Sequence, residues 1–313
     1  MTNKRVGCLS GQPTNIDLVS EKMTTFFPSY YNNFHCIADR CRHSCCVGWG
    51  ISVDDGTMAK YRALDRVDIL SHIEDGEIRL CDGGRCPFLL DSGLCQIISE
   101  LGDSYTSLIC QRHPRFFHRV GDRVECGIGL CCEEACRIVL SSDGYSDFFT
   151  SDFDGEVAEE TDFDSLSYRS HIYSILDRDD ITFADKISLI RQSYSLRDIH
   201  SSDEWAEIFK SLEYLDDRHC GLFKIGGRPG CGEKYLERFL AYLIFRHMSI
   251  AESYDNLRAR LGFCLLLTDI LADYISSGDR DFGDICEFAR IISEEIEYST
   301  DNTEDLIFEF EIN

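Results

Sequence analysis

Clustered cysteines constrain this chain more than any other feature of its sequence. Twelve of its 17 cysteines lie between Cys36 and Cys136, and two pairs are adjacent, Cys45–Cys46 and Cys131–Cys132. Cysteines at this density form either a disulfide framework or a set of thiolate metal ligands. The two alternatives require different cellular compartments and support different chemistry.

Several observations argue against a disulfide framework. Residues 1–21 contain no apolar stretch long enough for a secretory signal, and the number of cysteines is odd. Disulfide-dense folds are mostly small domains without a sufficient core, whereas this chain has 313 residues, 43% of them hydrophobic. We therefore expect a reduced, cytoplasmic protein whose clustered cysteines hold a metal ion or an iron–sulfur centre.

Charge and hydropathy narrow the possible partners. The net charge is −25, and residues 141–313 contribute most of it, with 16 Lys and Arg against 38 Asp and Glu. A surface this acidic argues against nucleic acid. It suits a Lys-rich protein substrate, and a solubilising surface is the alternative explanation. The longest apolar stretch, residues 261–275, is shorter than the roughly 20 residues of a membrane-spanning helix, so we expect a buried helix and no membrane insertion.

Composition divides the chain into four segments. Residues 1–25 are polar and are expected to be a disordered extension, and residues 26–140 form a loop-rich, cysteine-rich module. Residues 141–165 carry nine acidic residues and no basic one, and are expected to be an acidic linker. Residues 166–313 are expected to be helical. The predicted fold class is mainly α, with a loop-rich cysteine module followed by an all-helical half.

Periodicity supports the helical half. In residues 235–248 the apolar side chains follow the i, i+3, i+4, i+7, i+8 pattern of a helix that buries one face. His247 extends this stripe and is expected to be a core residue with its hydrogen bonds satisfied, not a ligand. Within the cysteine module, residues 54–70 are predicted to form a helix capped by Asp54 or Asp55, and residues 132–140 a short one.

The cysteines of the module fall into four groups. The first group, residues 36–46, has the spacing C-x4-C-x3-C-C. In the second group a short hairpin would bring Cys86 and Cys95 together. The third contains Cys110, and the fourth is the pair Cys131–Cys132. Thiolates need positive charge nearby and an enclosed site. Five arginines flank the cysteines and could supply the charge: Arg40, Arg42, Arg85, Arg112 and Arg115.

Zinc and an iron–sulfur cluster make different demands on spacing. Zinc sites usually pair C-x2–4-C knuckles, and the module contains no clean C-x2-C knuckle. Iron–sulfur ligation accepts irregular spacing, and Cys-Pro, as in Cys86-Pro87, is common in cluster-binding loops. We favour an iron–sulfur cluster, with zinc as the alternative, and His35, His43 and His113 leave mixed ligation open.

An ordered set of sequence blocks resembles the flagellin lysine-N-methylase family. The blocks include Phe27-Pro28-Ser29-Tyr30-Tyr31, residues 34–49 with the first cysteine group, Arg85-Cys86-Pro87-Phe88-Leu89, residues 110–116, residues 129–135, residues 235–247 and residues 294–302. The resemblance covers roughly residues 26–305. Its first three cysteine groups are also similar to a wider class of zinc- or iron-chelating modules, which alone would not imply methylation.

The resemblance implies methyl transfer from S-adenosylmethionine to lysine ε-amines of flagellin, and an iron–sulfur cluster expected to be of the 4Fe–4S type. The cysteines at family-type positions, expected to ligate the metal, are Cys36, Cys41, Cys45, Cys46, Cys86, Cys95, Cys110, Cys131 and Cys132. Cys81, Cys126 and Cys136 lie where the pattern does not demand cysteine, and are expected to be small buried hydrophobic residues.

Methyl transfer from a sulfonium to an amine is an in-line displacement that needs a neutral amine, whereas free lysine has a pKa of about 10.4. The site must desolvate the ammonium or offer a base, and hold both reactants in line. Rings attract the two cations and carboxylates accept the proton. The catalytic candidates are Tyr30, Tyr31, Trp49, Glu133, Glu134 and Tyr298. The candidates for cofactor binding are Arg112, His113 and Arg115.

Two familiar signatures are missing from the sequence. It has no Gly-rich strand–turn–helix of the common methyltransferase fold, because residues 226–230 are predicted to be a loop, and it lacks the C-x3-C-x2-C spacing of radical enzymes. A nucleophilic amine needs no radical, so we expect the cluster to have a structural or redox-gating role. The alternative function is a non-catalytic metal or iron–sulfur binding protein, acting in metal delivery or as a redox module. The oligomeric state is not predicted.

Overall fold

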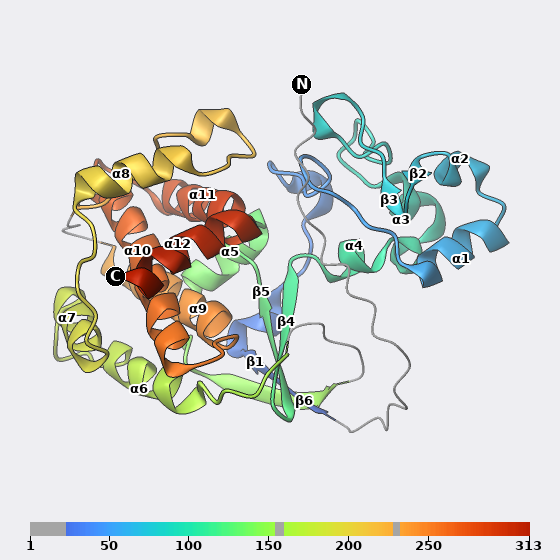
Figure 1. Cartoon of the computed structure of the whole chain (residues 1–313). Coiled ribbons are helices and arrows are strands. Elements are labelled where there is room, and N and C mark those ends of the chain that lie inside the picture. Colours follow the sequence, from blue (N-terminus) through green and yellow to red (C-terminus); the bar gives the residue numbers. More distant parts are fainter. Residues whose placement is uncertain (1–22, 154–159, 228–231) are drawn as a thin grey trace. The chain divides into compact units, whose positions relative to one another are not determined.

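The computed structural model describes residues 23–153, 160–227 and 232–313, and these form two compact units (Figure 1). The cysteine unit comprises residues 35–115, and the helical unit comprises the described residues of 21–34 and 116–313. Residues 1–22 of the expected extension, and residues 228–230 of the expected loop, lie outside the described residues, whereas residues 23–25 belong to a strand.

Short elements joined by loops make up the cysteine unit, as its composition predicts. In chain order they are η2 (Ala38–Arg40), α1 (Asp55–Ala63), α2 (Val67–Leu70), β2 (Ile73–Glu74), β3 (Glu77–Ile78), η3 (Asp82–Gly84), α3 (Gln96–Leu101), η4 (Asp103–Tyr105) and α4 (Leu108–Arg112). A small core of its own holds them together, with Ile51, Tyr61, Ile69, Phe88 and Ile97 among its buried residues.

Asp54, one of the two caps that the sequence offers, fixes the start of α1. Its carboxylate accepts hydrogen bonds from the backbone N–H of Thr57 at 2.9 Å and from that of Leu108, the first residue of α4, at 2.8 Å. The helix ends at Ala63 and does not continue to residue 70, because Asp65 adopts a left-handed φ of 51° that interrupts it. Asp54 therefore binds the N-terminal turns of both α1 and α4.

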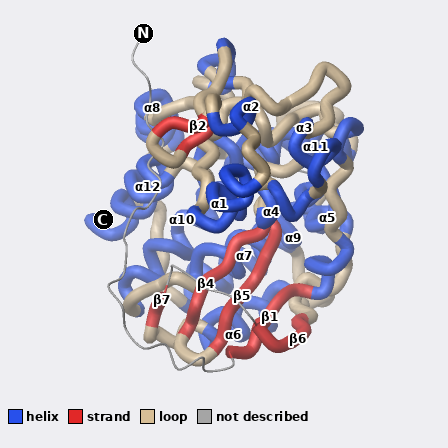
Figure 2. The backbone as a smooth tube through the Cα atoms, turned by 90° about the vertical axis from the view of Figure 1, so that its right-hand side faces the viewer, coloured by secondary structure: helices blue, strands red, loops and turns tan. Residues whose placement is uncertain are grey.

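A five-stranded sheet lies in the helical unit, with strand order β6-β1-β5-β4-β7 (Figure 2). The strands are β1 (Met23–Pro28), β4 (Arg115–Val120), β5 (Arg123–Ile128), β6 (Phe148–Phe153) and β7 (Glu160–Thr161). β1 runs parallel to β5, with Thr25 opposite Val124, and antiparallel to β6, with Phe27 opposite Phe149.

The segments expected from composition do not coincide with the observed structural units. The sheet draws residues 23–28 and 115–128 from the segment expected to be a loop-rich module, and strand β6 from the segment expected to be an acidic linker. The reason is that β1, which precedes the cysteine unit in the chain, pairs with β5, which follows it, so segments far apart in sequence lie side by side in the sheet. The expected fold class, mainly α, is confirmed.

Helices make up the rest of the helical unit. They are η1 (Ser29–Asn33), α5 (Glu133–Ser141), α6 (Leu166–Leu176), α7 (Phe183–Ser193), α8 (Ser202–Ser211), η5 (Asp217–His219), α9 (Glu233–Met248), α10 (Tyr254–Ser276), α11 (Phe282–Ile292), the π-helix η6 (Ser293–Glu297) and α12 (Thr300–Ile312). α10 packs against α9, α11 and α12, and α9 also packs against α5 and α6. The apolar stripe predicted on α9 is buried, including Leu236, Phe239 and Leu243.

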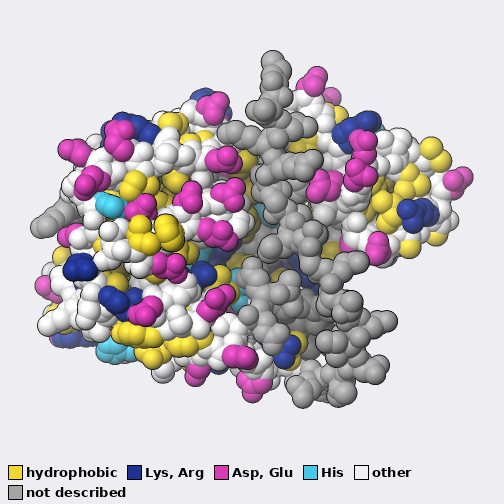
Figure 3. Space-filling model, in the orientation of Figure 1, with side chains coloured by type: hydrophobic (Ala, Val, Ile, Leu, Met, Phe, Trp, Pro, Cys, Tyr) yellow, Lys and Arg dark blue, Asp and Glu magenta, His cyan; other side chains and the backbone are white. Residues whose placement is uncertain are grey.

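The long apolar stretch at residues 261–275 lies within α10, and most of its side chains are buried in the core of the helical unit. None of the described helices combines the length and the apolar character that spanning a bilayer requires. On the face shown in Figure 3, acidic side chains are spread over the helical unit with basic ones among them.

Candidate metal centre and candidate active site

Backbone pairing brings the second cysteine group next to the first. The N–H of Cys86 donates to the carbonyl of Cys46 at 2.8 Å, and Val47 forms an antiparallel β-bridge with Arg85. The chain then turns back at Gly93, which has a left-handed φ of 82°. This turn lets Leu89 form an antiparallel β-bridge with Cys95. This is the hairpin that the sequence predicts between Cys86 and Cys95.

The thiols of the first three cysteine groups influence one another's ionisation. Burial raises the pKa of Cys86 to about 12, and the thiols of Cys46, Cys95 and Cys110 raise it further. Burial also raises the pKa of Cys110, with Cys46 and Cys95 adding to the effect. The thiols therefore converge from three separate stretches of the cysteine unit.

The adjacent pair Cys45–Cys46 is the most strongly perturbed part of this group. A hydrogen bond from Cys45 lowers the pKa of Cys46 to about 6 against the effect of burial, and Ser44 and the charge of Arg85 lower it further. The same hydrogen bond, then burial and the nearby thiols of Cys46, Cys36 and Cys110, raise the pKa of Cys45. The hydrogen bond within the pair thus favours the thiolate of Cys46 over that of Cys45.

Six of the nine predicted ligands form this coupled set, which we name the thiol cluster: Cys36, Cys45, Cys46, Cys86, Cys95 and Cys110. Cys41 lies in the same unit, and its thiol donates to the carbonyl of His43 at 2.9 Å. Cys131 and Cys132 belong to the helical unit, at the start of α5.

A guanidinium and a hydroxyl group lie beside the thiol cluster. The Arg85 guanidinium donates to the carbonyls of Leu89 and Leu90 at 2.8 and 3.0 Å, so it holds the Cys86–Cys95 hairpin while facing Cys46. The hydroxyl of Ser107 donates to the sulfur of Cys110 at 3.2 Å.

The three predicted cofactor-binding residues follow Cys110 closely in the chain. Arg112 ends α4, His113 comes next, and Arg115 begins β4; all three are partly buried. Burial lowers the pKa of His113 to about 4, so its imidazole is neutral at pH 7. A neutral imidazole can accept a hydrogen bond or ligate a metal ion.

The cysteines outside the predicted ligand set behave in two ways. Cys126 and Cys136 are buried small residues, as expected. Cys81 is not: its side chain is exposed, and its backbone N–H donates to the carbonyl of Arg85 at 2.7 Å. The expectation of burial was wrong for Cys81, because it lies in the turn that leads into the Cys86 loop and not in a core-facing element.

A second cluster of ionisable groups lies inside the helical unit, around Arg246 on α9. Its guanidinium donates to the hydroxyl of Tyr242 at 2.8 Å and lies 3.6 Å from the carboxylate of Glu297. The same guanidinium lies over the rings of Phe116 and Tyr298, 5.0 and 4.4 Å from their centroids. His247 contacts Glu297 at 2.8 Å, so it is the satisfied core histidine that the sequence predicts.

This buried network reaches the Cys131–Cys132 pair. The hydroxyl of Tyr242 accepts from the backbone N–H of Leu130 at 3.3 Å. Burial raises the pKa of Cys131 to about 12, although its hydrogen bond with Tyr298 and the charge of Arg246 oppose the shift. Burial favours a neutral Glu297, but Arg246 and His247 outweigh it and lower the pKa of this carboxyl.

The predicted catalytic residues do not form one group. Tyr30 and Tyr298 both lie near Tyr242, and burial raises the pKa of each well above its usual range. Tyr31 packs on Phe27 with ring centroids 5.3 Å apart. The remaining candidates are Glu133 and Glu134 in the first turn of α5, where Glu134 pairs with Arg137, and Trp49 in the cysteine unit.

Sequence reasoning gave no role to Arg246 or Glu297, although both lie in blocks that carry the family resemblance. A charged residue in an otherwise apolar helical stripe was the available signal, because burying an arginine requires a partner. Their partnership depends on how α9 packs against the π-helix η6, which no local pattern encodes.

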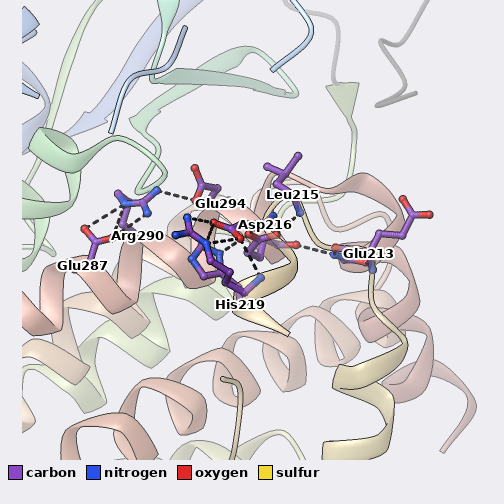
Figure 4. Close-up of polar contacts among 10 residues, drawn as sticks. Glu213, Leu215, Asp216, His219, Glu287, Arg290 and Glu294 are labelled. Atoms are coloured by element: carbon purple, nitrogen blue, oxygen red, sulfur yellow. Dashed lines mark hydrogen bonds and ion pairs between the residues drawn. The ribbon is translucent and has the colours of Figure 1, made fainter. Parts of the chain in front are cut away.

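Another ionisable group joins η5 to η6 in the helical unit (Figure 4). Within the part of the chain that the structure describes, His219, Glu294 and Glu295 are the three residues whose ligand atoms all lie within 4.8 Å. Glu295 accepts from the N–H groups of Leu215 and Asp216 at 2.7 and 3.2 Å and contacts His219 at 2.6 Å. Glu294 pairs with Arg290 at 2.8 Å. All three side chains therefore have protein partners. Glu295 holds the loop at residues 215–216 through its hydrogen bonds.

Comparisons with known proteins connect the chain to curated relatives. It is 30% identical over 134 residues to a protein of Salmonella typhimurium named Lysine-N-methylase, a match that covers 39% of this chain and 33% of that protein. It is 29% identical over 134 residues to the Flagellar biosynthetic protein FliU of Salmonella muenchen, covering 39% of this chain and 79% of that protein.

Other comparisons gave no match: no family model fits the chain, and no solved structure matches it. The aligned segment spans about one third of the Salmonella typhimurium Lysine-N-methylase. The resemblance read from the sequence agrees with these relatives, which match 39% of this chain and are named Lysine-N-methylase and Flagellar biosynthetic protein FliU.

Proposed function

We propose that this protein transfers a methyl group from S-adenosylmethionine to lysine side chains of flagellin, and that its thiol cluster holds an iron–sulfur cluster needed for fold or activity. The observation that carries the proposal is the similarity to a protein named Lysine-N-methylase, at 30% identity over 134 residues. The name of the second relative, a flagellar biosynthetic protein, supports flagellin as the substrate.

The donor set of the cysteine unit fits an iron–sulfur cluster. A 4Fe–4S cluster takes four cysteine thiolates, and the coupled thiols of Cys46, Cys86, Cys95 and Cys110 supply that number, with Cys36 and Cys45 beside them. The lowered pKa of Cys46 and the charge of Arg85 favour the thiolate that a metal requires. Such a cluster would supply a covalent crosslink between loops and one-electron redox chemistry.

Methyl transfer makes demands that the helical unit can meet. The target lysine must lose its proton, and its ammonium must leave water. The phenols of Tyr30 and Tyr298 keep their protons because their pKa values are raised, so they would act as hydrogen-bond donors and aromatic contacts. Among the catalytic candidates, Glu133 and Glu134 are the carboxylates that could accept a proton.

A non-catalytic metal or iron–sulfur binding protein is the second candidate function. The observation that favours it is that the thiol cluster lies in a compact unit with its own hydrophobic core. A unit of this kind can hold a metal without help from a catalytic domain. Metal delivery or redox exchange would then be its role.

Metal analysis and methyl transfer on one sample separate the two functions. The full chain is purified anaerobically, its iron, sulfide and zinc are measured, and labelled S-adenosylmethionine is supplied with purified flagellin. The proposal predicts iron and sulfide in matching amounts and label on flagellin lysines, located by mass spectrometry. Stoichiometric zinc, or metal without methyl transfer, would favour the binding-protein function.

A matched pair of cysteine variants adds a control. Cys110→Ser removes a member of the thiol cluster, and Cys220→Ser removes an exposed cysteine of the helical unit. We expect Cys110→Ser to lose most of its iron while Cys220→Ser keeps it. Equal iron content in the two variants would show that the cluster lies elsewhere.

A further inference from the structure

A pocket of about 290 Å³ opens on the helical unit between β1, β6 and α6. Three aromatic rings form its wall. Phe26 and Phe148 stack with centroids 4.7 Å apart, and Phe148 stacks on Tyr173 at 5.8 Å. Phe26 and Phe148 are half-buried, so parts of their rings remain open to a ligand.

Strand register explains why these rings share one side of the sheet. Phe26 lies opposite Thr150, and Phe148 lies opposite Pro28. Because side chains alternate between faces along a strand, Phe26 and Phe148 point to the same face. Phe149, the next residue of β6, points to the other face and packs near Phe27 with centroids 6.4 Å apart.

Arg169 lines the pocket, and carboxylates behind it pair with its charge and with that of Arg123. Arg169 lies beneath the rings, 5.9 Å from the Phe26 centroid and 5.6 Å from that of Phe148. Its charge is paired with Glu125 at 2.6 Å, and Arg123 contacts both Glu125 at 3.0 Å and Asp164 at 3.7 Å. The carboxylates of Glu125 and Asp164 offset the charges of Arg169 and Arg123, which weakens the repulsion between Arg169 and a cation in the pocket.

Negative charge and hydroxyl groups lie at the rim. Asp177, at the end of α6, is exposed and accepts a hydrogen bond from Ser146 at 3.3 Å. Ser170 and Ser174 line the same rim. A ligand that enters between the rings and the rim meets the aromatic side chains along its length and the Asp177 carboxylate at its end.

We propose that this pocket binds a lysine side chain of the protein substrate, including its methylated forms; this inference rests on the proposed function. The four-carbon stem of lysine suits the rings of Phe26 and Phe148, and its ammonium, or a methylated ammonium, is attracted by aromatic faces and by Asp177. The volume lies just below the roughly 300–1,000 Å³ of small-molecule sites, which suits one side chain better than a nucleoside-bearing donor.

Binding of small probes to the full chain tests the pocket directly. The probes are Nα-acetyl-lysine methylamide, its Nε-trimethyl derivative and the neutral Nα-acetyl-norleucine methylamide, titrated by NMR against protein with labelled Phe and Tyr rings. We expect the two cations to bind and shift the ring signals of Phe148 and Tyr173. Equal binding of the norleucine probe, or shifts confined to other rings, would overturn the proposal.

Two matched pairs of variants locate the site. Phe148→Leu removes a ring of the pocket, and Phe149→Leu removes its neighbour on the opposite face. Asp177→Asn removes the rim carboxylate, and Asp179→Asn removes an equal charge two residues away, outside the pocket. An exposed cation–π contact is worth a factor of about two to five. We therefore expect Phe148→Leu and Asp177→Asn to weaken binding of the cations by at least that much, and the controls to leave it unchanged.

If Phe149→Leu and Asp179→Asn weakened binding of the cations as much as Phe148→Leu and Asp177→Asn do, the proposal would be overturned. If Phe148→Leu fails to fold, Asp177→Asn still tests the pocket. Displacement of the lysine probe by S-adenosylhomocysteine would assign the pocket to the donor instead. Methyl transfer to flagellin is measured on the same samples. Methyl transfer without probe binding would reject the pocket and keep the proposed function, whereas probe binding without methyl transfer would reject the function alone.

Discussion

Arg169 and Glu125 form a bidentate ion pair in the interior of the helical unit. Nη1 of Arg169 lies 2.6 Å from Oε2 of Glu125, and Nη2 lies 2.7 Å from Oε1. Both side chains are buried, and the hydroxyl of Ser249 contacts both. Since Glu125 is on β5 and Arg169 on α6, the pair ties the sheet to the helices that follow it.

Removing one partner of this pair should destabilise the protein strongly. In Glu125→Gln the charge of Arg169 stays buried without its bidentate partner, which costs about 3–5 kcal/mol in other proteins. We expect a loss of that size in the free energy of unfolding at pH 7, measured by urea denaturation. Glu207→Gln is the control, because Glu207 forms an exposed pair with Lys210 and should contribute less than about 1 kcal/mol. A loss no larger than the control's would contradict this account.

The same pair predicts a pH dependence. Burial alone would raise the pKa of Glu125, but Arg169 and Ser249 outweigh it and lower the pKa to about 2, from an ordinary value of 4.5. A lowered pKa gives stability that is present above pH 4.5 and is lost as the pH falls toward 2. The stability difference between the wild type and Glu125→Gln should therefore shrink as the pH falls below 4.5, as urea denaturation between pH 6 and pH 3 would show. A constant difference would contradict the prediction.

Gly129 is required by the approach of Tyr298. A side chain at residue 129 would collide with the Tyr298 hydroxyl, and the ring carbon that bears it would lie 2.7 Å from the new Cβ. We expect Gly129→Ala to destabilise the protein by about 1–3 kcal/mol, the usual effect of overpacking. Tyr298→Phe should recover part of this loss, because it removes the hydroxyl and leaves the ring. Thermal unfolding of the two single variants and the double variant measures the coupling, and strictly additive effects would contradict the contact.

Asp54 offers a prediction for the cysteine unit. It accepts from the N–H groups of Thr57 and Leu108, so Asp54→Ala should weaken both α1 and the helix that carries Cys110. An N-cap is worth about 1 kcal/mol, up to about 2. Hydrogen exchange should show lost protection at the amides of Thr57 and Leu108. Asp55→Ala, which removes the neighbouring exposed carboxylate, should leave both amides protected, and protection retained in Asp54→Ala would refute the double cap.

Local patterns in the sequence predicted the features that local patterns control. The α9 stripe, the Asp54 cap and the Cys86–Cys95 hairpin follow from spacing within a few residues. The hairpin of β4 and β5 also had a local signal, Gly121-Asp122 between two apolar runs, and was overlooked. The parallel pairing of Thr25 with Val124 had none, because the whole cysteine unit lies between them in the chain.

In the candidate sites too, local sequence patterns predicted some features, whereas contacts between distant segments were not predicted. Cysteine spacing marked the three short segments that carry the thiol cluster, whereas the ligand set implied by the family resemblance also included Cys41, Cys131 and Cys132, which lie outside it. It did not find the partnership of Arg246 and Glu297, nor the stacking of Phe26 on Phe148, because each contact joins elements distant in sequence. Charge composition indicated an acidic surface but not where an exposed carboxylate such as Asp177 meets aromatic rings.

His219 and Glu295 predict a pH-sensitive loop. The hydrogen bond with Glu295 raises the pKa of His219 above its ordinary value of 6.5, against the effect of burial. A raised pKa gives stability that is fully present below pH 6.5 and is lost as the pH rises through the folded-state value. The amides of Leu215 and Asp216, which also donate to Glu295, should therefore show smaller protection factors at pH 8.5 than at pH 6 in hydrogen exchange. His219→Asn should abolish this difference and His200→Asn should preserve it, whereas protection that does not change with pH in the wild type would show that the histidine does not hold the loop.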